Sequence, residues 1–401
     1  GRIVFYDIIA GTDYGKQTDR LLKDPSAWYH IVFVSDTTNS TAGDRYRLYV
    51  NGVRETSFDT DYGDVPQNYD GNVNDAIVHS IGKRTDGPSY FNGYLAETIL
   101  VDGQALDPTD FGEFDSDSGI WKPIEITDTS FTWGTNGFWL NYSNAASMGA
   151  NSAGTGGFSV QNVNQNDQAT DTPTNNFCTL NPLNAVNNGG GNVGYTQGAT
   201  QGTALQTDEP ASGSMAVTKG KWYFECKAVS NSDMMAGWGV PNKWGDHSNN
   251  PGNDSYSFAV HSVGRVYYYG NTYVDFSPSV GYDTNDIVSV ALDADNGYCY
   301  WAKNGTWMNG GDPTSGSTAT GGFNYIGGST GANMEIVAGD FLVPAFRTNY
   351  YTNSAVLVNF GGYTTISISS AQSDADGYGT FEYSPPSGYY AMCTKNLAEY
   401  G

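Results

Sequence analysis

The sequence has few of the residues that build exposed helix faces, and little positive charge. Its 401 residues include only 9 Glu and 10 Lys, beside 33 Asp, 51 Gly and 29 Tyr. Glu and Lys favour helices, whereas Gly and Asp favour turns and Tyr favours strands, which argues against a mostly helical protein. The 18 Lys and Arg are outnumbered by 42 acidic residues, giving a net charge of −24. Such a charge repels phosphates, so we expect no nucleic-acid partner.

Long apolar runs and paired cysteines are also missing. No stretch approaches the roughly 20 apolar residues that cross a bilayer, so we expect no membrane insertion. The apolar runs, such as 31–34, have the length of a strand. Because neither a CxxC pair nor a nearby His cluster occurs, no zinc site is expected. Four cysteines spread over more than 200 residues do not make a disulfide scaffold either. The cysteines, interpreted as mostly buried free thiols, are Cys178, Cys226, Cys299 and Cys393.

What the sequence does contain is a series of short strands separated by turn residues. Asn51-Gly52 is typical of a two-residue hairpin turn, and Asp107 to Asp110 predicts one capped helical turn. Strands spaced in this way predict a sandwich. In the first region we expect strands at 28–34, 46–50, 53–56, 77–82 and 94–101.

We therefore predict an all-β chain with two antiparallel β-sandwich (jelly-roll) domains joined by a polar linker. The opening residues resemble the middle of a strand, which suggests a fragment of a longer protein. The predicted segments are 1–123 for the first sandwich, 137–142 for a strand that can close it, 143–177 for the linker, 178–395 for the second sandwich with its core at 218–362, and 396–401 for the start of a further segment.

Three motifs in the first region resemble the laminin-G-like, concanavalin-A-like jelly roll. They are a W-x-H strand at 28–32, an R-L-Y-V-N-G hairpin at 47–52 and an F-x-G segment at 91–97. The resemblance covers about 28–106. Most of the opening strands expected in this family are missing, in line with a fragment.

Five segments in the second half resemble a SPRY domain. They follow one another in the order expected for that family, which makes this resemblance the most specific feature of the chain. The segments are 220–225, 236–240, 286–293, 300–305 and 342–346.

The combined arrangement resembles large virion proteins of marine tailed phages, on segments 100–108, 134–138, 171–176 and 385–389. This resemblance implies a structural and adhesive role in a fibre or on the particle surface, and hence a virion-surface or extracellular location. The implied partners are other virion proteins, copies of this chain, and host-surface carbohydrate. The alternatives are a secreted or cell-surface bacterial adhesin, a glycan-active enzyme, and an architectural decoration protein whose aromatic residues are buried against other subunits.

Two partial motifs for catalysis fail on chemical grounds, so we expect no enzyme. A glycosidase strand of the form E-x-D-x-x-E begins at Glu113, but Ser118 replaces its second acid, so that the acid/base pair is incomplete. A G-x-S-x-G string at 327–331 lies in a glycine-rich loop without the helix that a nucleophile elbow needs.

Aromatic loops in the second region are the candidate ligand site. Aromatic faces beside Asp and Asn suit stacking on sugars with hydrogen bonds to their hydroxyls, so the rings should be exposed and clustered. The alternative is that these rings pack the sandwich core or an adjacent subunit. The candidate residues are Trp244, Asp246, His247, Tyr267, Tyr269, Tyr273 and Trp307.

Calcium is the one cofactor that the sequence leaves open. Acidic loops in the first region can supply the several oxygen ligands that a hard cation requires. A solvated turn surface explains the same residues and is the simpler interpretation. The candidate ligands are Asp59, Asp61, Asp64 and Asp70.

Overall fold

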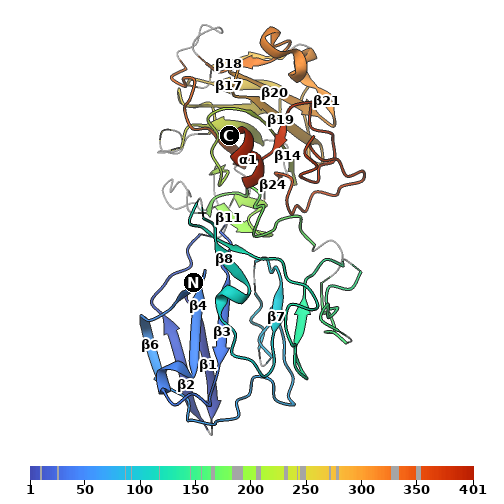
Figure 1. Cartoon of the computed structure of the whole chain (residues 1–401). Helices are drawn as coiled ribbons and strands as arrows, with labels where there is room; N and C mark the ends of the chain where they lie inside the picture. The colour runs from blue at the N-terminus through green and yellow to red at the C-terminus, as the bar shows by residue number, and fades with distance from the viewer. Residues whose placement is uncertain are drawn as a thin grey trace. The chain divides into compact units, whose positions relative to one another are not determined.

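In the computed structural model the chain forms two compact units, residues 1–168 (unit 1) and 169–401 (unit 2), and each is described by itself. Strands form most of the regular structure (Figure 1), which confirms the all-β prediction. No helix in the described part of the chain is long and apolar enough to span a bilayer. The structure describes all residues except 10, 25–26, 86, 92, 117, 145, 155, 164–167, 183–192, 205–208, 230–233, 242, 244–249, 271, 277–279, 327–333 and 349–353.

Unit 1 is built from small antiparallel sheets. One has the order β1-β2-β6 and another the order β3-β4-β5, and two further pairs are β7 with β10 and β8 with β9. Ring contacts join the two larger sheets, with the centroids of Phe5 and Phe33 5.3 Å apart. The elements are β1 (Val4–Ile9), β2 (Thr12–Thr18), β3 (Ile31–Ser35), η1 (Ala42–Asp44), β4 (Tyr46–Val50), β5 (Val53–Arg54), β6 (Phe58–Gly63), β7 (Thr98–Leu100), η2 (Pro108–Asp110), β8 (Gly112–Phe114), β9 (Trp121–Pro123) and β10 (Phe138–Leu140).

The local turn chemistry of unit 1 follows the sequence closely. Asn51 and Gly52 both have positive φ, as the hairpin between β4 and β5 requires. Asp107 and Asp110 form a reciprocal capping box around η2. The strand predicted at 77–82 is absent, because this segment pairs with no neighbouring strand, and Val78 is 81 % exposed.

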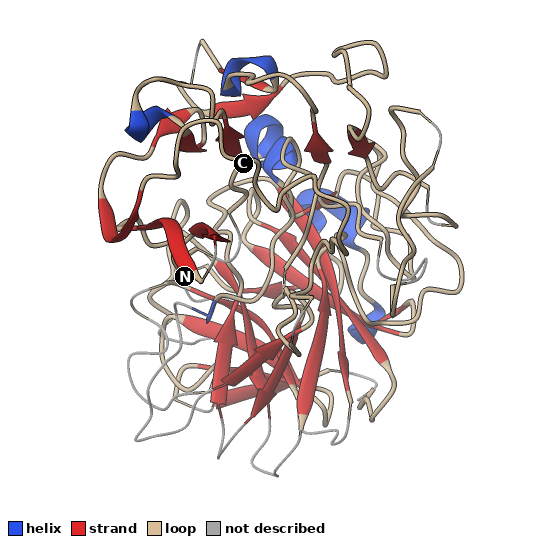
Figure 2. Cartoon of the chain, turned by 90° about the horizontal axis from the view of Figure 1, so that it is seen from below, coloured by secondary structure: helices blue, strands red, loops and turns tan. Residues whose placement is uncertain are grey.

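Unit 2 contains a nine-stranded and a six-stranded sheet. The first has the order β11-β12-β24-β14-β19-β20-β21, with β22 paired to β20 and β25 to β14; the second has the order β13-β23-β15-β16-β17-β18. The strands are β11 (Val193–Thr196), β12 (Gln201–Ala204), β13 (Glu209–Ser212), β14 (Lys221–Ala228), β15 (Met235–Gly239), β16 (Ser257–His261), β17 (Arg265–Tyr268), β18 (Thr272–Asp275), β19 (Ile287–Asp293), β20 (Tyr298–Lys303), β21 (Thr306–Trp307), β22 (Phe323–Asn324), β23 (Val343–Thr348), β24 (Ala355–Asn359) and β25 (Tyr390–Ala391). The helical elements are η5 (Met308–Gly310), η6 (Pro313–Thr318) and α1 (Thr394–Tyr400), all of them short (Figure 2).

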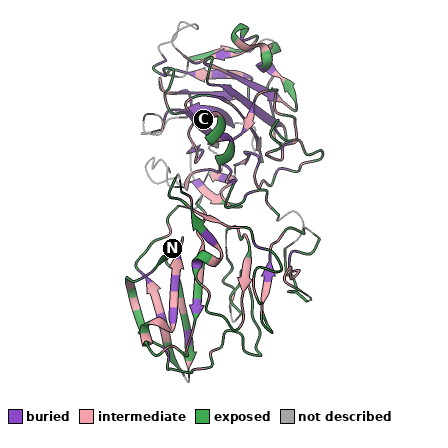
Figure 3. Cartoon of the chain, in the orientation of Figure 1, coloured by how far each residue is buried: buried purple, intermediate pink, exposed green. Residues whose placement is uncertain are grey.

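A dense aromatic core lies between the two sheets of unit 2. Phe224 of β14 contacts the rings of Trp238, Phe346 and Phe360 at centroid distances of 5.3–5.6 Å. The indole of Trp301 donates a hydrogen bond to the carbonyl of Ala236, 2.9 Å away, so its buried polar atom is satisfied. Figure 3 shows the central strands of this unit as almost wholly buried.

The opposite face of the nine-stranded sheet carries a second, smaller core. There, Tyr223 of β14 packs against Phe381, and Phe177 and Tyr389 complete the cluster. The four cysteines are buried and free, as predicted. Burial raises the pKa of the Cys178 thiol to about 11.

Glu225 fastens the C-terminal segment across this second core. Its carboxylate accepts hydrogen bonds from the backbone of Glu382 (3.0 Å) and Tyr383 (2.8 Å), from the hydroxyl of Tyr223 (3.0 Å) and from the amide of Asn359 (3.2 Å). Burial raises the pKa of the Glu225 carboxyl, and these four donors pull it back toward its ordinary value.

Two of the predicted boundaries differ from the structure. The expected linker, 143–177, is divided between the units, and Met148 (8 % exposed) and Phe177 (2 % exposed) show that it carries core residues. The expected further segment, 396–401, lies instead in unit 2: Asn396 is buried, and Leu397 and Tyr400 pack against the main core. A few apolar residues are enough to attach these segments of unit 2, because Phe177, Leu397 and Tyr400 pack against cores that the strands of the sheets form.

A candidate aromatic binding face

The six-stranded sheet of unit 2 presents a polar and aromatic outer face at its β16-β17-β18 end. Side chains alternate along β17, so that Val266 and Tyr268 enter the core while Arg265 and Tyr267 face outward. The register places Tyr267 directly opposite Tyr273 of β18. We call the outward set His261, Arg265, Tyr267, Tyr273 and Asp275 the aromatic face.

Close ring contacts hold the aromatic face together. The Tyr267 ring lies 5.6 Å from that of Tyr273 and 5.3 Å from the His261 imidazole. The guanidinium carbon of Arg265 lies 4.3 Å from the Tyr273 ring centroid. Arg265 also donates from Nε to Asp275 at 2.6 Å, and this carboxylate raises the pKa of the guanidinium. The tyrosines are thereby fixed in orientation before any ligand arrives.

Exposure of the aromatic face makes it available to a ligand. Tyr273 is 44 % exposed, and Tyr267 is partly buried. Tyr269 follows at the turn after β17, with a φ of +40° and 39 % exposure. The Tyr267 and Tyr273 rings are tilted by 45° to one another, so a single ring, such as that of Tyr273, can stack on the apolar face of a sugar while Arg265 and Asp275 hydrogen-bond to its hydroxyls.

Of the other predicted ligand residues, Trp307 does not join this face. Trp307 lies in β21 of the nine-stranded sheet, where it packs against the smaller core. Its place follows from the alternation of β20 and β21, which turns its ring toward the covering C-terminal segment. Trp244, Asp246 and His247 lie outside the described residues, as does the G-x-S-x-G string at 327–331.

Three of the four predicted calcium ligands are paired with cations, and two of them share Lys16. Asp59 forms an ion pair with Arg2 at 2.7 Å. Lys16 lies 2.9 Å from Asp61 and 3.3 Å from Asp64. Asp70 is exposed on a separate loop. Within the described ranges, no group of three or more His, Cys, Asp or Glu side chains could hold a metal ion. Calcium binding at these four residues stays a prediction.

Sequence reasoning missed three members of the aromatic face: His261, Arg265 and Asp275. A signal for them was present. The hairpins β16-β17 and β17-β18 place His261 opposite Arg265 and Arg265 opposite Asp275. Counting outward from each turn would have placed all three beside the tyrosines.

Comparison with known families identifies a domain in each unit. Residues 3–110 match the model of the concanavalin A-like lectin/glucanases superfamily, and residues 221–339 match the SPRY domain. Both predicted resemblances are confirmed. The first match begins well before the predicted start near residue 28 and takes in β1 and β2. The two domains indicate a binding or adhesive role.

Other comparisons add little. No curated protein matches the chain. One solved structure, titled "Stonustoxin structure", aligns with 12 % identity and a TM-score of 0.32, over 45 % of this chain and 27 % of the other. The chain thus spans about a quarter of the length of that protein.

Proposed function

We propose that this chain is a non-enzymatic structural and adhesive protein of a tailed-phage particle, in a fibre or on the particle surface. It binds host-surface glycans through the aromatic face of unit 2 and contacts neighbouring virion proteins and other copies of itself. The observation that carries the adhesive part is the Tyr267–Tyr273 pair, oriented by Arg265 and open to solvent. The phage setting rests on the resemblance of the combined segments to virion proteins.

Support for carbohydrate over an apolar partner comes from the composition of the face. Its two tyrosines alternate with charged groups that already satisfy one another, so the surface is hydrated and suits a ligand with many hydroxyls. The bacterial adhesin remains the second candidate, because the same face serves either protein. The two differ in where the intact protein resides, which imaging of purified particles with an antibody to this chain would decide.

The glycan hypothesis is tested by binding of the full chain to an array of bacterial surface glycans. Tyr267→Ala combined with Tyr273→Ala should weaken binding to any bound glycan at least about tenfold, which corresponds to about 1.4 kcal/mol, since it removes both rings on which a sugar can stack. Arg265→Gln should weaken it less, because it loosens Tyr273 without removing the ring.

The control is Tyr90→Ala, which removes a tyrosine of unit 1 that is 65 % exposed. It should bind as the wild type does. Circular dichroism of each variant confirms that the fold is kept. Wild-type binding by the double variant, or no binding of any glycan by the wild type, would contradict the proposed function.

A further inference from the structure

The β8-β9 hairpin of unit 1 has little that attaches it to the rest of the unit. Its two strands pair with each other and with no other strand in the part of the chain that the structure describes. Phe114 and Ile120 of the hairpin are 52 % and 67 % exposed, so they contribute little buried apolar area. Because a two-stranded hairpin on its own is marginally stable, the position of this one depends on the contacts of its remaining side chains.

Trp121 of β9 provides such contacts. Its ring packs against Gly112 of β8 and against Gly52 of the β4-β5 turn, so closely that neither glycine leaves room for a Cβ. The ring also stacks on the imidazole of His30, with centroids 5.7 Å apart and planes inclined by 22°. The indole N–H donates a hydrogen bond to Nδ1 of His30 at 3.0 Å. Trp121 therefore joins the hairpin to the β4-β5 turn and to the residue directly before β3.

The hydrogen bond between Trp121 and His30 requires a neutral imidazole. An indole nitrogen can only donate, so Nδ1 of His30 must keep its lone pair and the ring proton must be on Nε2. Protonation places a hydrogen on Nδ1, where it faces the indole N–H, and two donors cannot bond to each other. It also puts a charge on a partly buried ring that packs against Phe111.

The charged groups of the hairpin pair with one another. Nζ of Lys122 lies 3.3 Å from the carboxylate of Glu113 and 3.1 Å from that of Asp115. Strand alternation places Lys122 and Glu113 on the face of the hairpin away from Trp121. The hairpin therefore presents Trp121, and not this ion pair, to His30.

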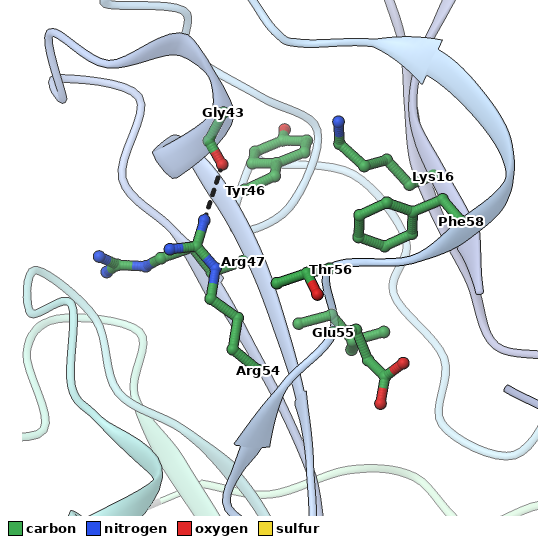
Figure 4. A pocket seen from close by; sticks show the side chains of 9 residues that line it. Lys16, Gly43, Tyr46, Arg47, Arg54, Glu55, Thr56 and Phe58 are labelled. Carbon is green, nitrogen blue, oxygen red and sulfur yellow. Dashed lines mark hydrogen bonds between the residues drawn. The ribbon is translucent and has the colours of Figure 1, made fainter. Parts of the chain in front are cut away.

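The β4-β5 hairpin uses its charge within itself and its neighbouring turn. Arg54 donates from Nη2 to the carbonyl of Gly43 at 2.9 Å, as Figure 4 shows, and to the carboxylate of Asp44 at 2.6 Å. The other titratable groups on the elements around His30 belong to β4, to the residue before His30 and to the capping box of η2. They are Arg47, Tyr49, Tyr29, Asp107 and Asp110. Burial, and not a neighbouring charge, lowers the pKa of the His30 imidazole below its ordinary value.

We propose that the β8-β9 hairpin is an acid-sensitive switch: protonation of His30 breaks its hydrogen bond with Trp121, and the hairpin opens reversibly away from the β4-β5 turn. In the open state His30 is in water and binds a proton more tightly than in the closed state. A fall in pH through the ordinary histidine range therefore favours opening, and neutral pH favours the closed hairpin. The switch lies in unit 1 and does not depend on the function proposed for unit 2.

The test is amide hydrogen exchange of the full chain at about pH 7.5 and about pH 5.5, on either side of the ordinary histidine pKa, with rates corrected for the pH dependence of the chemical step. Peptides spanning 112–123 should exchange at least about threefold faster at the lower pH. Peptides of β1 and β2 should exchange equally at both, since the opening is local. His30→Gln should abolish the difference, because its amide oxygen accepts from the indole and does not titrate.

Two other variants of unit 1 are the matched controls. His79→Gln removes the second histidine of the unit, which is exposed. Glu97→Gln removes a half-buried carboxyl whose pKa is raised by burial. Protonation of Glu97 acts with the opposite sign, because burial favours the neutral acid. Both variants should keep the acid response of the wild type.

Trp121→Phe provides a further arm, because it keeps an aromatic ring but removes the indole donor. Its 112–123 peptides should exchange faster than those of the wild type at neutral pH and respond less to acid. Equal corrected rates of the wild type at both pH values, an unchanged response in His30→Gln, or a lost response in His79→Gln or Glu97→Gln overturns the proposal. Should His30→Gln fail to fold, Trp121→Phe decides, and a wild-type response in that variant also overturns it.

Discussion

The two units use the same kind of strand in opposite ways. In unit 2 all seven residues of β19 are buried, because the main core covers one face of its sheet and the C-terminal segment covers the other. In unit 1 only Asp7 of β1 is buried, and Val4, Tyr6 and Ile8 are 44–49 % exposed.

Polar contacts replace apolar burial in unit 1. Asp7 accepts a hydrogen bond from the backbone of Asn72 at 2.9 Å and another from its side chain, which fastens β1 to a loop. The comparison teaches that unit 2 is stabilised mainly by buried apolar area, and unit 1 by side-chain bonds and well-formed turns.

The sharpest test of this difference is removal of one large ring from the main core. Phe224→Ala should lower the free energy of unfolding of unit 2 by about 3–5 kcal/mol, because it leaves a cavity among three further rings. Amide hydrogen exchange of β14 and β19 peptides in the full chain measures the loss. Val4→Ala in β1 is the control and should change stability by about 0.5 kcal/mol or less. Similar losses of stability in the two variants would contradict the proposed difference between unit 1 and unit 2.

The next largest effect concerns a polar contact inside the apolar unit. Glu225→Gln should cost about 2 kcal/mol, because three of the four partners of this carboxylate are N–H groups that can only donate, and the new amide nitrogen leaves at least one of them without an acceptor. Faster amide exchange of peptides spanning 379–391, read against the exposed control Glu399→Gln, reports the loss. If exchange there is unchanged, Glu225 does not fasten the C-terminal segment.

A pair of hairpin glycines compares turns between the units. Gly52 (φ +75°) faces Trp121, whose ring would lie 2.3 Å from an added Cβ, whereas Gly270 (φ +64°) has nothing within 4 Å. Gly270→Ala should cost about 1 kcal/mol for the left-handed backbone alone, and Gly52→Ala about 2 kcal/mol or more, since Trp121 must also move. Urea unfolding, followed by amide hydrogen exchange in each unit, measures both losses of stability. Equal losses would show that the Trp121 side chain moves aside at no cost in free energy.

The smallest effect is a pH dependence in unit 1. Lys16 and the backbone of Gly63 hold the pKa of Asp61 below its ordinary value. The stabilisation is therefore complete above the ordinary Asp pKa of about 3.9 and is lost as the pH falls through the lowered value. Because the pair is exposed, the difference between wild type and Asp61→Asn should be about 0.5 kcal/mol at pH 7 and shrink as the carboxyl becomes protonated. If the stability difference between wild type and Asp61→Asn grew on acidification, the pKa of Asp61 would not be lowered in the folded state.

Most of the correct fold predictions rest on the preferences of neighbouring residues for turns, helix caps and strands. The Asn51-Gly52 turn, the capping box at Asp107 and the strands 46–50 and 287–293 follow from neighbouring residues alone. The strand expected at 77–82 failed because an apolar run becomes a strand only where a neighbouring strand lies beside it. That condition depends on tertiary structure.

The candidate site was predictable only in part. The Tyr267–Tyr273 pair was expected because the aromatic density is visible in the sequence, whereas Trp307 shares that density but lies on the other sheet. The cations that neutralise Asp59, Asp61 and Asp64 come from residues about 45–57 positions away in the sequence. A local sequence pattern therefore cannot predict these ion pairs.

The pairing of β14 has a consequence for how the chain is made. This strand contacts β19, β24 and β25, so Trp222 finds its last partner, Tyr390, 168 positions later. Contacts so distant in sequence slow folding, because a long loop must close before they form. During synthesis, the aromatic residues of β14 stay without this partner until nearly half the chain has followed them. Over that interval their apolar surface is exposed, so we expect unit 2 to be the part of the protein that most needs a chaperone.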